Sequence, residues 1–148
     1  MTSHPIKEVA HMSARLTPQE ALTYAMITVS AVDRAMTDDE LSRIGSIVQQ
    51  LPAFQGYDHD WLVRKAEDCG AVLAEAGGLD KVLDMIAEAL PQRLRETAYV
   101  LAAEVAASDL KVPIEEVRFL EMLADKLNID ALTCAALERA AKARHQRV

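Results

Sequence analysis

Apolar residues recur along most of this chain at the three- and four-residue spacing of one helix face. Valines are scattered and form no alternating run that would indicate a strand. Together with the helix-start signals, the spacing predicts about seven helices, beginning near residues 17, 37, 58, 79, 91, 113 and 130. The expected fold class is therefore all-α.

Two of the predicted helix starts carry a complete capping box, in which a Thr side chain and a Glu three residues later bond each other's backbone N–H. These are Thr17-Pro18-Gln19-Glu20 and Thr37-Asp38-Asp39-Glu40. Gly77-Gly78 predicts a break between helices. Residues 1–16 show no pattern, so we expect a flexible tail at 1–16 and one helical domain at 17–148.

A shift of the chain by 76 residues, which places Glu20 on Glu96, aligns two similar segments. Each has a helix, an Asp at the corner that follows, an apolar residue three positions on, a Glu seven positions on, and a second apolar helix. Neither segment can bury its apolar face alone. The repeat predicts two pseudo-symmetric helical hairpin halves around one core, bridged by the third and fourth helices.

The net charge of −7 argues against a general nucleic-acid or anionic-membrane binder, which needs a basic face. No apolar run reaches the length of a membrane span, and the N-terminus lacks the pattern of a secretory signal. Cys69 and Cys134 fit buried free thiols better than a disulfide or zinc pattern. We therefore expect a cytoplasmic protein that does not insert into membranes.

The candidate ligand residues lie at the two corners, the segments that join the two helices of each repeated copy. Asp33 and Asp109 lie near helix C-termini, and Glu40 and the pair Glu115-Glu116 lie in the first turns of the helices that follow. A tight corner brings such carboxylates together, and oxygen-only clusters suit hard cations such as Ca²⁺ or Mg²⁺. The alternative is structural, because Asp closes turns and the capping box alone explains Glu40. Glu116 has no such explanation, since Pro113 stands where Thr37 does in the first copy.

The doubled pattern, Val29-x-x-x-Asp33-x-x-Met36-x-x-Asp39-Glu40-Leu41 and Val105-x-x-x-Asp109-x-x-Val112-x-x-Glu115-Glu116-Val117, resembles the TerB-like family of tellurite-resistance proteins. The similarity covers about residues 17 to 145. It implies an all-helical fold with two pseudo-symmetric halves and an acidic, cation-binding surface rather than a catalytic centre. It also implies a role in tellurite resistance and stress response, with protein partners in membrane-associated assemblies.

The chain departs from the family pattern where a glycine usually follows each corner Asp, because Arg34 and Leu110 stand there. A side chain at these places narrows the backbone conformations open to the corner. No phosphate loop, nucleophile elbow or zinc spacing occurs. The leading hypothesis is a non-enzymatic module that binds partners and divalent cations. The alternatives are a helical metalloenzyme or hydrolase, and a purely structural, oligomerising helical domain.

Overall fold

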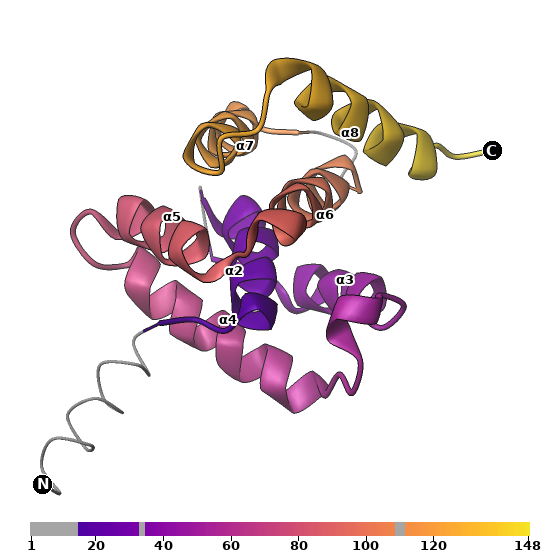
Figure 1. Ribbon diagram of the computed structural model, residues 1–148. Helices are drawn as coiled ribbons and strands as arrows, with labels where there is room; N and C mark the ends of the chain where they lie inside the picture. The colour runs from indigo at the N-terminus through magenta and orange to yellow at the C-terminus, as the bar shows by residue number, and fades with distance from the viewer. Residues whose placement is uncertain (1–14, 33–34, 109–111) are drawn as a thin grey trace, which may run out of the picture.

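The computed structural model describes residues 15–32, 35–108 and 112–148 (Figure 1). Across these residues the chain forms seven α-helices, two short 3₁₀ helices and no β-strand, which confirms the all-α prediction. The α-helices are α2 (Pro18–Ala31), α3 (Asp38–Val48), α4 (His59–Leu73), α5 (Gly78–Ala89), α6 (Arg95–Ala107), α7 (Ile114–Lys126) and α8 (Ala131–Arg144). The 3₁₀ helices are η1 (Pro52–Phe54) and η2 (Gln92–Leu94).

Side chains at the predicted positions begin four of the helices. Thr17 and Thr37 each accept the N–H of a Glu three residues on, at 3.1 and 3.2 Å, and each Glu accepts the Thr N–H in return at 2.8 Å. Asp58 accepts the N–H of Asp60 at 3.3 Å to cap α4, and Asp130 accepts the N–H of Thr133 at 3.0 Å to cap α8. These bonds satisfy N–H groups that have no partner inside the helix, which is why the helices start at these residues.

The break between α4 and α5 depends on two glycines. Gly77 has φ of +68°, a conformation that residues with a side chain rarely adopt. A Cβ on Gly78 would collide with the backbone carbonyl of Val72. The chain can therefore turn sharply enough to pack α5 against both α4 and α2.

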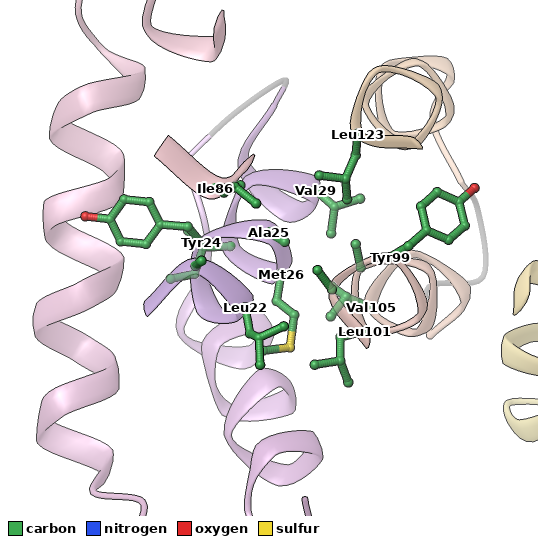
Figure 2. Close-up of a cluster of buried hydrophobic side chains, with 14 of the residues drawn as sticks. Leu22, Tyr24, Ala25, Met26, Val29, Ile86, Tyr99, Leu101, Val105 and Leu123 are labelled. Carbon is green, nitrogen blue, oxygen red and sulfur yellow. The ribbon is translucent and has the colours of Figure 1, made fainter. Parts of the chain in front are cut away.

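Helices α2 and α6 pack against each other at the centre of the molecule (Figure 1). All residues of α2 from Ala21 to Ser30 are buried, as a helix surrounded by protein on every side requires. Met26 of α2 faces Leu101 and Val105 of α6 across the contact (Figure 2). Leu16, which precedes α2, is also buried in this core, so it is not part of the flexible tail predicted at 1–16. Residues 1–14 of that predicted tail lie outside the described residues.

The remaining helices cover this central pair. Helix α4 packs on α2 and α3, just as α8 packs on α6, so α4 belongs to the first half of the molecule. Of the third and fourth helices, α5 makes the main contacts with both halves, because it packs on α2 and α4 on one side and on α7 on the other. This differs from the expected bridge of two helices. Cys69 and Cys134 are free and buried, as predicted.

Candidate functional site

The first corner is the segment between α2 and α3. Glu40, in the first turn of α3, is only 6% exposed. Its carboxylate accepts the backbone N–H of Thr37 at 2.8 Å, so the capping role predicted for Glu40 is present. One of the two carboxylate oxygens is thereby used to start the helix.

The second corner is the segment between α6 and α7. Glu116 in the first turn of α7 is 3% exposed, deeper than its counterpart, whereas Glu115 beside it is exposed. The N-cap residue is Pro113, which makes no side-chain cap. The two corners therefore bury a glutamate at the same helical position but only the first does so within a capping box.

The two corners are joined across the molecule. Arg43 Nη1 in α3 donates to the Ser108 hydroxyl oxygen at the end of α6, at 3.4 Å. Ser108 in turn donates to the carbonyl of Val105 at 2.6 Å, which fixes the last turn of α6. A residue of the first corner's helix thus contacts the residue that directly precedes Asp109.

The proposed cation ligands are only partly placed by the structure. Glu40, Glu115 and Glu116 are described, whereas Asp33 and Asp109 lie outside the described residues. Within residues 15–32, 35–108 and 112–148, no three His, Cys, Asp or Glu side chains form a group that could hold a metal ion. A cation site at either corner consequently depends on its Asp and stays a prediction.

Each corner borders a groove that the sequence pattern did not reveal. The first groove lies between α2, α3 and α4 and encloses about 520 Å³; the second lies between α6, α7 and α8 and encloses about 430 Å³. Four lining positions of the first groove have counterparts 76 residues on in the second: Ile27 and Ala103, Ala31 and Ala107, Met36 and Val112, Leu41 and Val117. The apolar residue three positions after each Asp is thus a groove residue.

The two grooves differ in the third helix that lines them, which is α4 in the first groove and α8 in the second. In the second groove α8 contributes Glu138 and Lys142, and the Tyr99 hydroxyl donates to Glu138 at 2.5 Å. Burial, followed by the carboxylate of Glu138, raises the pKa of Tyr99 well above its ordinary value, so this tyrosine stays a neutral donor. Val112 and Val117 are each 41% exposed at the mouth of this groove. The hydrogen bond between Tyr99 and Glu138 thus joins α6 to α8 beside an exposed apolar surface.

No helix among the described residues combines the length and the apolar character needed to cross a membrane. In the comparisons with known proteins, residues 19–140 match a family model described as "Tellurite resistance protein TerB". That match runs from the start of α2 into the last turns of α8. No curated protein and no solved structure matches the chain.

Proposed function

Because this chain belongs to the TerB family and is a tellurite-resistance-type module, we propose that it works by binding partners rather than by catalysis. The observation that carries this proposal is the repeated construction of the two corners. Each places a buried glutamate in the first turn of a helix and an aliphatic groove beside it. Each groove combines a hollow shape and apolar area with lining carboxylates, Asp38 and Glu67 in the first and Glu121 and Glu138 in the second, and these are elements of protein recognition.

The proposed partners are proteins of a membrane-associated stress assembly, reached from the cytoplasm. The net charge of −7 favours partners with basic surfaces, because charge complementarity speeds association and excludes acidic competitors. Divalent cations form the second part of the proposal. We place the cation at the second corner, on Asp109, Glu115 and Glu116, because the first turn of α7 adds two glutamates to the corner Asp.

Isothermal titration with Ca²⁺, Mg²⁺, Mn²⁺ and Zn²⁺ near pH 7 tests the cation part. We expect saturable binding to the wild type and a loss of about tenfold or more in the Asp109→Asn, Glu116→Gln double variant, because two ligand charges are removed without a change of shape. Thermal unfolding of the same variant checks that the buried Glu116 position still folds.

Two controls make this titration specific. The first-corner pair Asp33→Asn, Glu40→Gln should keep most of the cation affinity, since Glu40 serves the capping box. The pair Glu88→Gln, Glu96→Gln removes two exposed glutamates elsewhere and should leave the affinity unchanged. Absence of heat with every cation, or equal heat from the Asp109 and Glu116 variant, contradicts a cation site at the second corner.

A further inference from the structure

One glycine of this chain has no role in the described fold. The chain has five glycines. Two adopt positive φ, one would collide with backbone and one would come within 2.9 Å of the Tyr57 hydroxyl if it carried a Cβ: Gly56, Gly77, Gly78 and Gly45 respectively. The fifth, Gly70, lies inside α4, where an added Cβ would meet no atom within 4 Å. Glycine weakens a helix interior, so Gly70 lowers the stability of α4, and no contact within the described fold requires it.

Gly70 lies on the wall of the first groove. Around it the groove is lined by other small side chains, among them Ala31 of α2, Ala66 of α4 and Ala74, which directly follows α4. Larger apolar side chains, Ile27 and Leu41, lie deeper or on the opposite wall. A missing side chain on a helix face lets another backbone approach closely, which is where glycine is of use. A polypeptide segment that approaches Gly70 in this way would come from outside the described fold.

The charged residues that line this groove indicate what kind of polypeptide segment can bind there. Among the described residues that line the first groove, the charged ones are Asp38 at the start of α3 and Glu67 on α4, and both are exposed. The second groove, by contrast, has Lys142 beside Glu121 and Glu138. The first groove is therefore apolar between two acidic walls, and its complement is an apolar stripe with basic residues on both sides.

We propose that the first groove binds an amphipathic helix of a partner protein, with its apolar stripe against Ile27 and Leu41 and its Lys or Arg side chains beside Asp38 and Glu67. This rests on the proposed binding function and names the segment recognised. A helix fits because it presents apolar anchors three and four residues apart together with flanking charges. The chain's own basic helix α8 is a poorer match, because Leu132 is the only large apolar side chain it exposes within the described residues.

The probe is a fluorescein-labelled Leu/Lys peptide of about 14 residues with leucines at helical spacing. Its binding is followed by fluorescence anisotropy in EDTA, so the result does not depend on cations. We expect Gly70→Trp to weaken binding by about tenfold or more, because the indole fills the groove. Circular dichroism should show an intact fold, since the added Cβ has open space. Asp38→Asn with Glu67→Gln should weaken binding by about threefold to tenfold and reduce its salt dependence.

Glu121→Gln, which removes an acid from the second groove, is the matched control and should leave the affinity unchanged. The proposal is overturned if Gly70→Trp binds the peptide as well as the wild type, or if a Leu/Glu peptide of the same spacing binds equally. Sedimentation equilibrium adds one more outcome. If the wild type is a dimer that Gly70→Trp dissociates, the occupant is a second copy of this chain and the proposal is wrong. The cation titration at the second corner is unaffected by any of these results.

Discussion

At the scale of single residues, Glu20 serves two purposes. One carboxylate oxygen accepts the N–H of Thr17 at 2.8 Å and completes the cap of α2. The other pairs with Lys65 of α4 at 2.8 Å, with both side chains only about one-fifth exposed. Burial alone would raise the pKa of Glu20, but the bonds from Lys65 and Thr17 outweigh it and hold that pKa below the ordinary 4.5.

Glu20→Gln should therefore lower the free energy of unfolding by about 1 kcal/mol near neutral pH. A carboxylate with a lowered pKa stabilises the fold above its unfolded pKa, and this stabilisation is lost as the pH falls through the folded pKa. The difference between wild type and variant should thus become smaller when the pH is lowered from 7 to 3. Urea unfolding at the two pH values measures it, with the exposed Glu67→Gln as control. A difference that stays constant with pH contradicts the role given to this carboxylate.

At the scale of the elements, four helices begin at a side-chain cap, and α6 is one of those that begin without a cap. Pro91 was expected to open a helix directly. Instead it precedes the 3₁₀ turn η2, and α6 begins at Arg95 without a side-chain cap. Arg95 Nη1 donates to the carbonyl of Leu127 at the end of α7, at 3.0 Å. A contact between distant parts of the chain thus accompanies this start, whereas α2, α3, α4 and α8 begin at a neighbouring Thr or Asp.

Two glycines inside neighbouring helices give a matched prediction at this scale. Gly70→Ala should raise the free energy of unfolding by about 0.5–1 kcal/mol, because alanine is the better helix former and the space is open. Gly45→Ala in α3 should fall short of this gain, because its Cβ lies 2.9 Å from the Tyr57 hydroxyl, which bonds His59 Nδ1. Urea denaturation compares the two variants. An equal gain from both shows that Tyr57 moves aside at no cost.

At the scale of the whole molecule, the buried contact between α2 and α6 makes the two halves share one core (Figure 2). Met26 is fully buried in that contact. Met26→Ala should lower the free energy of unfolding by about 2–5 kcal/mol, because it removes packed atoms and leaves a cavity. Chemical denaturation followed by far-UV circular dichroism measures the loss. A change below about 1 kcal/mol contradicts a central place for this side chain.

A shared core also predicts that the two halves unfold together. Trp61, the only tryptophan, lies in α4 of the first half, whereas circular dichroism reports helices of both halves. We expect the two signals to change together in wild type and in Met26→Ala, as they do in a single cooperative unit. If the Trp61 signal changes before the helical signal, the two halves unfold separately and the single-domain prediction is wrong.

The sequence by itself determined the features that depend on near neighbours. Helical spacing predicted the all-α class, and Thr17, Thr37, Asp58 and Asp130 marked helix starts because a cap bonds residues two or three positions away. For the same reason the capping role of Glu40 was foreseen. The match of residues 19–140 to the TerB family likewise bears out the resemblance seen in the doubled pattern.

Only the tertiary structure decided which helix faces meet. It placed α4 in the first half, joined Arg43 to Ser108 and left a groove beside each corner. It also showed that Gly70, an isolated glycine in a helical stripe, lies on a groove wall with open space beyond it. Such features arise from packing between residues far apart in the chain, and periodicity along one helix carries no information about its neighbours.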